Sequence, residues 1–178
     1  LDKFGYLFKN NEKINETPFA VKQETEYVLE IFQNFIFLRE NKILYQFNTS
    51  SKTFEKFFEG INSLKISPDL KKLVYFSDSE IWILFLKEKL DQPSRKAGEK
   101  IFLVRFLEKV GDVFWMNSNY LIFNVGDKLK IAEIDDRDGI NGYNLVEFNK
   151  PKIFWNQIDK KAYILSEGNL FVSGNLIP

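Results

Sequence analysis

Apolar and polar residues alternate in a unit that recurs along most of the chain. Each unit contains an apolar triplet, a short polar turn and a second apolar stretch. In successive units the second stretch is marked by Ile43, Ile81, Leu129 and Leu170, which are separated by 38, 48 and 41 residues. The turns contain Asn, Asp, Gly or Ser, which tolerate the backbone conformations of tight hairpins. The pattern therefore predicts short antiparallel strands joined by hairpins, with a partial earlier copy at 5–8.

A complete unit has room for four strands. Expected strands are Asn62–Ile66, Lys72–Ser77, Glu80–Lys87, Lys100–Glu108, Asp112–Met116, Tyr120–Asn124, Lys128–Ile134, Tyr143–Phe148, Lys152–Asn156, Ala162–Leu165 and Asn169–Val172. Nearer the N-terminus we expect strands near Phe19–Val21 and Tyr27–Phe32. Four strands in a repeat of roughly 40 residues are typical of a β-propeller blade, whereas helical repeats would show an apolar period of about 3.6 residues.

The predicted fold class is therefore all-β, a partial or small β-propeller with four-stranded antiparallel blades. We expect one propeller domain or propeller fragment over residues 1–178. Its blade-like units are 1–22 (partial), 23–60, 61–109, 110–149 and 150–178 (partial). A ring normally needs about 4–8 blades, so a segment of a larger ring is expected. The first residue, Leu1, is not methionine, which also favours a fragment or processed form.

Composition limits the chemistry that the chain offers. It has no cysteine and no histidine, and its 25 basic and 25 acidic side chains balance. These absences exclude thiolate zinc sites, cysteine catalysis and imidazole-dependent triads. Zero net charge disfavours a general nucleic-acid surface. A Gly-x-Ser-x-Gly elbow and a glycine-rich phosphate loop are also missing. We therefore expect no enzyme activity, no catalytic residue, no metal and no cofactor within this chain.

Three sets of residues could have a catalytic or ligand-binding role in place of a purely structural one. Glu24, Glu26, Glu30, Asp78 with Glu80, and Asp135 with Asp136 could supply glycosidase carboxylates, although solvent contact is the simpler interpretation. The loop 135–142 is acidic enough to suit a cation, but its spacing favours an ordinary turn. Trp115 and Trp155 occupy the same repeat position, which favours packing between blades over stacking on a ligand.

Two loops are the predicted partner-binding segments. The polar stretch 87–100 carries Pro and Gly and lengthens the 48-residue repeat, and 135–142 is the second loop. Binding residues of repeat proteins often lie on such connections. The residues assigned to possible partner binding are Lys87, Gln92, Arg95, Lys96, Asp136 and Asp138.

The stretch Ser67-Pro68-Asp69-Leu70-Lys71-Lys72-Leu73 resembles the Ser-Pro-Asp-Gly-Lys-Lys-Leu motif of TolB-type, WD40-like blades. Leu70 occupies the position where those blades usually carry Gly, so the turn could have a different geometry in this chain. From about 35 to 175 the chain also resembles the C-terminal propeller of PEGA-domain-containing proteins from candidate-phylum bacteria, mainly through 78–86, 114–130 and 131–139. That resemblance implies an extracytoplasmic protein, anchored in the membrane by a region absent from this chain.

Two functional hypotheses follow. In the first, a non-catalytic propeller segment binds a protein or small ligand at the bacterial cell envelope. In the alternative, the chain is the gating domain of a larger hydrolase that resembles prolyl peptidases, and the catalytic domain is absent. The partner is unknown in both, nucleic acid is not expected, and unpaired edge strands offer a route to self-association.

Overall fold

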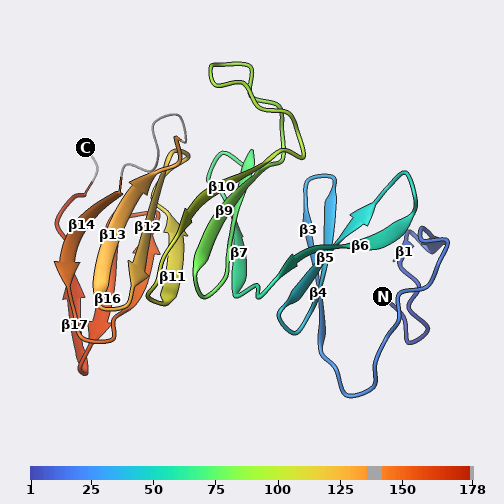
Figure 1. Ribbon diagram of the computed structural model, residues 1–178, viewed down its shortest axis with the longest axis horizontal. Coiled ribbons are helices and arrows are strands. Elements are labelled where there is room, and N and C mark those ends of the chain that lie inside the picture. The colour runs from blue at the N-terminus through green and yellow to red at the C-terminus, as the bar shows by residue number, and fades with distance from the viewer. Residues whose placement is uncertain (136–141, 177–178) are drawn as a thin grey trace. The chain divides into compact units, whose positions relative to one another are not determined.

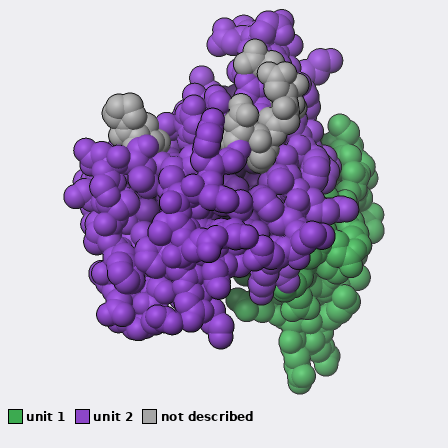
Figure 2. All heavy atoms as spheres, turned by 60° about the vertical axis from the view of Figure 1, so that its left-hand side comes forward, with its two compact units in different colours: residues 1–61 green, residues 62–178 purple. Residues whose placement is uncertain are grey.

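The structure is a computed structural model that describes residues 1–135 and 142–176 (Figure 1). These residues form β-strands and no helix, so the described part of the chain has no helix that could cross a membrane. Two compact units are present, Leu1–Ile61 and Asn62–Pro178, which are coloured separately in Figure 2. That all blade-like units belong to one domain or fragment stays a prediction.

The first unit contains a short hairpin and a four-stranded antiparallel sheet in sequence order. The hairpin strands are β1 (Phe8–Lys9) and β2 (Glu12–Lys13), and the sheet strands are β3 (Tyr27–Phe32), β4 (Phe35–Glu40), β5 (Ile43–Asn48) and β6 (Thr53–Glu59). The strand expected at Tyr27–Phe32 is confirmed as β3. The strand expected at 19–21 is wrong, because these residues belong to no strand.

The aromatic ring of Phe19 explains that difference. It packs edge-on against Tyr27, Tyr45 and Phe54, with ring centroids 5.9, 4.8 and 5.7 Å away. Edge-to-face aromatic contacts of this kind stabilise a side chain without needing a backbone ladder. Side-chain packing of Phe19, rather than strand pairing, therefore places this segment against the sheet.

Asn15 organises the rest of the N-terminal segment. Its side chain is almost fully buried and makes three hydrogen bonds: Oδ1 accepts from the Leu7 amide (2.6 Å), and Nδ2 donates to the carbonyls of Gly5 and Thr17 (both 2.9 Å). Buried backbone groups outside a ladder need such partners. The side chain of Asn15 thus supplies hydrogen-bond partners for three backbone groups of a loop that the repeat pattern does not predict.

The second unit contains three antiparallel sheets, each in sequence order. Their strands are β7 (Ser63–Ile66), β8 (Lys72–Phe76), β9 (Glu80–Phe85) and β10 (Lys100–Arg105); β11 (Val110–Trp115), β12 (Tyr120–Val125), β13 (Lys128–Glu133) and β14 (Gly142–Glu147); and β15 (Lys152–Asn156), β16 (Lys161–Ser166) and β17 (Asn169–Val172). The strands predicted for this unit are thus confirmed, with strand ends differing by at most three residues.

Strand β12 shows how neighbouring sheets share a core. Leu121, Phe123 and Val125 pack with the β7–β10 sheet, while Ile122 packs with the β15–β17 sheet. Successive side chains of a strand point to opposite faces, so a strand covered on both faces is apolar throughout. Asn124 is the polar exception, and it accepts a hydrogen bond from the Asp112 amide (2.8 Å) and donates one to the Pro151 carbonyl (3.3 Å).

The turn between β7 and β8 keeps the conformation that glycine would supply. Ser67 and Lys72 close it through a backbone hydrogen bond of 2.8 Å, and the Leu70 amide donates to the Ser67 carbonyl (2.9 Å). Leu70 has φ 58°, in the left-handed region. The turn therefore keeps the left-handed backbone conformation that glycine usually adopts here, although the residue is leucine. The backbone of Leu70 is strained as a result, because its Cβ atom disfavours this conformation.

Replacing Leu70 with glycine should therefore stabilise the second unit by about 0.5–1 kcal/mol, because relief of left-handed strain outweighs the extra freedom of glycine in the unfolded chain. The leucine side chain is about half exposed, so little packing is lost. Urea denaturation measures the change. Lys71→Gly is the control and should destabilise, since Lys71 is outside the positive-φ region; stabilisation by both variants would contradict the explanation.

Candidate functional site

A cleft of about 330 Å³ lies between the β7–β10 and β11–β14 sheets of the second unit. Its walls come from the connection between β9 and β10, the starts of β8 and β10, the β11–β12 turn and the end of β13. The residues that line it are Lys72, Phe85, Lys89, Asp91, Gln92, Pro93, Arg95, Ile101, Asn119, Glu133, Ile134 and Asp135. Segments from two neighbouring sheets therefore meet at one concave surface.

The β9–β10 connection is held in shape by its own hydrogen bonds. Lys89 and Arg95 exchange two backbone hydrogen bonds of 2.8 and 2.9 Å, and the Gly98 amide donates to the Phe85 carbonyl (2.8 Å). The Arg95 guanidinium pairs with Glu99 at 3.2 Å. Figure 1 shows the connection extending beyond the ends of β9 and β10. It is a hairpin extension that presents side chains at defined positions.

The turn at the start of β8 supports the opposite side of the cleft. Lys72 is buried, and its ammonium group pairs with Asp69 at 3.0 Å. Burial alone would raise the pKa of Asp69, but hydrogen bonds from Ser67, Lys72 and the Lys71 amide outweigh burial and lower that pKa. The Lys72 charge is thus neutralised within the turn.

Other charges at the cleft are available to a ligand. Lys89, Asp91 and Glu133 line it, and their side chains make no ion pair within residues 1–135 and 142–176. Lys89 and Glu133 are half-buried, and Asp91 is exposed. These three side chains offer one ammonium group and two carboxylates, which suits a partner that carries charges of both signs.

The predicted binding residues separate into three groups. Gln92 and Arg95 line the cleft. Lys87 and Lys96 are exposed on the same connection but do not line it. Asp136 and Asp138 lie outside the described residues. A binding role for these six residues stays a prediction. Lys89 also lines the cleft and lies within the predicted loop 87–100, although it was not singled out there. The contributions of Lys72, Asn119 and Glu133 were missed, because they come from turns and strand ends outside the two predicted loops.

The two equivalent tryptophans belong to the core. Trp115 and Trp155 are each 3% exposed, and Trp115 lies in the core between the first two sheets of the second unit while Trp155 lies in the core between the last two. Trp115 Nε1 donates to the Lys65 carbonyl at 2.9 Å. Packing between blades is therefore confirmed, and buried rings are not positioned to stack on a ligand.

The candidate glycosidase carboxylates have different surroundings. Glu80 accepts a hydrogen bond from Trp82 Nε1 (2.9 Å) and pairs with Arg105, and these donors lower its pKa. Asp78 accepts from Asn62 at 2.9 Å and lies 3.4 Å from Lys109. Burial raises the pKa of Glu30, opposed by Arg39. Glu24 and Glu26 are exposed, and Asp136 is outside the described residues.

The loop 135–142, predicted as an ordinary turn with a cation site as the alternative, consists mostly of residues that the structure does not describe. In the described part of the chain, no group of three or more acidic side chains is arranged to hold a metal ion. The edge strand β17 pairs only with β16 among described strands, and Leu170, Phe171 and Val172 are exposed there. Self-association through this edge stays a prediction.

Comparison with solved structures supports the fold. The β-propeller domain of Cps50 (Swd1) from Myceliophteria thermophila is similar over 90% of this chain and 59% of that domain, with 14% identity and a TM-score of 0.53. A candidate 6-phosphogluconolactonase from Bacteroides fragilis is similar over 79% of this chain and 47% of that protein, with 11% identity and a TM-score of 0.51. The chain thus spans about half the length of these structures.

No protein-family model and no curated protein matches the chain. At identities this low, structural similarity shows the fold and leaves activity open. The repeat pattern, the four-stranded antiparallel sheets and the match to a propeller domain agree with one another. The chain therefore has an all-β, β-propeller fold.

Proposed function

We propose that this chain is a non-catalytic binding domain whose cleft between the β9–β10 connection and the end of β13 holds a short polar segment of a partner protein. The observation that carries the proposal is the meeting of two blades at one surface, with charges of both signs that have no ion-pair partner among residues 1–135 and 142–176. Lys89, Asp91 and Glu133 supply those charges. The backbone hydrogen bonds between Lys89 and Arg95 limit the conformational entropy that this connection loses when a partner binds.

The size and chemistry of the cleft favour a peptide segment. Its 330 Å³ is at the small end of the range for ligand pockets, about 300–1,000 Å³. A peptide backbone offers donors and acceptors along its length, and Gln92 and Asn119 can pair with both. Phe85, Pro93 and Ile101 add apolar contact. A few side chains of a partner loop would be enough to pair with the polar groups of the cleft and to cover its apolar residues.

The cellular context is part of the proposal. The resemblance to PEGA-domain-containing proteins supports a place at the bacterial cell envelope, with the propeller facing away from the membrane. The alternative, a gating domain of a larger hydrolase, predicts a catalytic domain elsewhere in the same protein, and the flanking gene sequence distinguishes the two.

A random heptapeptide library tests the proposed cleft. Selection on the 178-residue chain should enrich peptides that bind the wild type. The triple variant Lys89→Ala, Asp91→Ala, Glu133→Ala should bind them about tenfold more weakly or worse, because it removes the unpaired charges. Binding is measured by isothermal calorimetry with synthetic versions of the enriched peptides.

A matched control changes the same connection outside the cleft. The variant Lys87→Ala, Glu88→Ala, Lys96→Ala replaces exposed residues that do not line the cleft, and it should bind within about twofold of the wild type. The proposal is wrong if no peptide is enriched, if the cleft variant binds normally, or if the control loses as much affinity as the cleft variant.

A further inference from the structure

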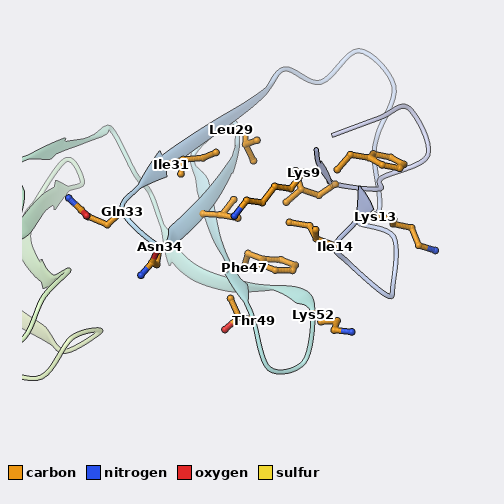
Figure 3. A pocket seen from close by; sticks show the side chains of 13 residues that line it. Lys9, Lys13, Ile14, Leu29, Ile31, Gln33, Asn34, Phe47, Thr49 and Lys52 are labelled. Atoms are coloured by element: carbon orange, nitrogen blue, oxygen red, sulfur yellow. The ribbon is translucent and has the colours of Figure 1, made fainter. Parts of the chain in front are cut away.

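A second cavity, of about 640 Å³, lies in the first unit between the β1–β2 hairpin and the β3–β6 sheet (Figure 3). Its wall is mainly apolar. The lining residues are Leu7, Phe8, Lys9, Lys13, Ile14, Leu29, Ile31, Gln33, Asn34, Ile36, Phe47, Thr49 and Lys52. All of them belong to the first unit, so this site is independent of the proposed peptide cleft.

The apolar wall includes side chains that the fold leaves open to water. Ile31 is 61% exposed, Phe8 is 48% exposed and Leu29 is 38% exposed, although Leu7 and Phe47 behind them are buried. Leu29 and Ile31 lie two residues apart on β3 and therefore share one face of the sheet. Such a concentration of exposed apolar surface around a cavity is a feature of binding sites.

The charged residues that line the cavity are all lysines. Three lysines, Lys9, Lys13 and Lys52, contribute to the lining, and no aspartate or glutamate does. Lys52 is paired with Glu16 at 3.1 Å, and Lys13 lies over the Tyr6 ring at 4.5 Å. Lys9 has no ion pair with any residue that the structure describes.

The direction of these side chains singles out Lys9. Figure 3 shows the Lys9 side chain extending over the cavity between Leu29 and Phe47, whereas the Lys13 ammonium group points away. An ammonium group at the edge of an apolar cavity complements an anion attached to an apolar body.

We propose that this cavity binds a single-chain anionic amphiphile, with the acyl chain against Leu29, Ile31 and Phe47 and the head group on Lys9. The cavity is large enough for one alkyl chain, and burial of its methylene groups against the apolar wall favours binding. Both carboxylate and phosphate head groups satisfy the geometry. A cationic amphiphile would place a like charge beside Lys9.

Calorimetric titration of the whole chain with laurate, dodecyl phosphate and dodecyltrimethylammonium tests the proposal. We expect saturable binding of the two anions with one site per chain, and binding of the cation at least about tenfold weaker. The relative affinities of laurate and dodecyl phosphate show which head group is preferred. Absence of saturable binding by either anion would overturn the proposal.

Two variants separate charge from apolar contact. Lys9→Glu should weaken laurate binding about tenfold or more by reversing the charge, and Ile31→Gln should weaken it about threefold or more by removing apolar surface. Both residues are exposed, so the fold should persist.

Lys13→Glu is the matched control, because Lys13 lies on the same hairpin but points away from the cavity. It should retain laurate affinity within about twofold. Equal losses of laurate affinity in Lys9→Glu and Lys13→Glu would mean that general surface charge attracts the anion. Tight binding of dodecyltrimethylammonium would mean that apolar contact alone drives binding. Either result contradicts the role of Lys9.

Discussion

Replacing Phe123 with alanine is expected to lower the free energy of unfolding of the second unit by about 3–5 kcal/mol. Phe123 is 1% exposed and lies in the core shared by the β7–β10 and β11–β14 sheets, where its ring contacts Phe106 with centroids 5.7 Å apart. Removing the ring leaves a cavity that closely packed strands cannot fill. This loss is large compared with the usual stability of a domain, about 5–15 kcal/mol.

Tryptophan fluorescence during urea denaturation measures the loss. The three tryptophans, Trp82, Trp115 and Trp155, all belong to the second unit, so the signal reports that unit. Phe154→Ala is the matched control, since that ring is 56% exposed, and its cost should be at most about 1.5 kcal/mol. Similar costs for the two variants would contradict a core shared between neighbouring sheets.

Gly5→Ala is expected to release the N-terminal segment from the first unit. Gly5 has φ 86°, and a Cβ atom added there would lie 1.9 Å from the Phe19 carbonyl oxygen. Because the obstructing atom is backbone, no side-chain rotation relieves the clash, and left-handed strain adds about 1–2 kcal/mol. The hydrogen bonds from the Phe19 amide (2.8 Å) and Asn15 Nδ2 (2.9 Å) to the Gly5 carbonyl should be lost.

Hydrogen exchange followed by mass spectrometry checks this expectation, with faster exchange predicted for peptides covering residues 1–22. Gly98→Ala is the control that separates the effect of backbone strain from the effect of a steric clash. Gly98 has φ 85°, yet no atom lies within 4 Å of an added Cβ. It should cost only the backbone strain, about 1–2 kcal/mol, without local release. Unchanged exchange at 1–22 in Gly5→Ala would show that the segment is not fixed by this contact.

The repeat could be predicted from the sequence because strand periodicity is local. The four equivalent positions Ile43, Ile81, Leu129 and Leu170 all lie on the third strand of their sheets, β5, β9, β13 and β17. Hairpin turns and alternating side chains fix such positions without long-range information. The predicted strand ends differ from the observed ones by up to three residues, because the end of a strand depends on pairing with its neighbour as well as on its own sequence.

The N-terminal segment could not be predicted in the same way. Phe19 and its neighbours are apolar enough to suggest a strand, but aromatic contacts with Tyr27, Tyr45 and Phe54 decide their position. The role of Asn15 also depends on which backbone groups are left without ladder partners. Both are tertiary effects that override local preference.

The candidate site was predicted only in part. Proline and glycine marked the β9–β10 connection as a loop, and Gln92 and Arg95 reach the cleft. Sequence alone could not show that Glu133, from the next blade, faces the same space as Lys89. That meeting follows from the packing of two sheets, whereas charge and loop character are local properties.

Amide chemical shifts of the isotope-labelled chain, measured while a selected heptapeptide is added, test the central claim most directly. The account predicts that the largest shifts cluster at Lys89, Asp91, Gln92, Asn119 and Glu133, which line the cleft of the second unit. They should disappear in the triple cleft variant. Shifts centred on the β17 edge or on the apolar cavity of the first unit, with the cleft unchanged, would contradict it.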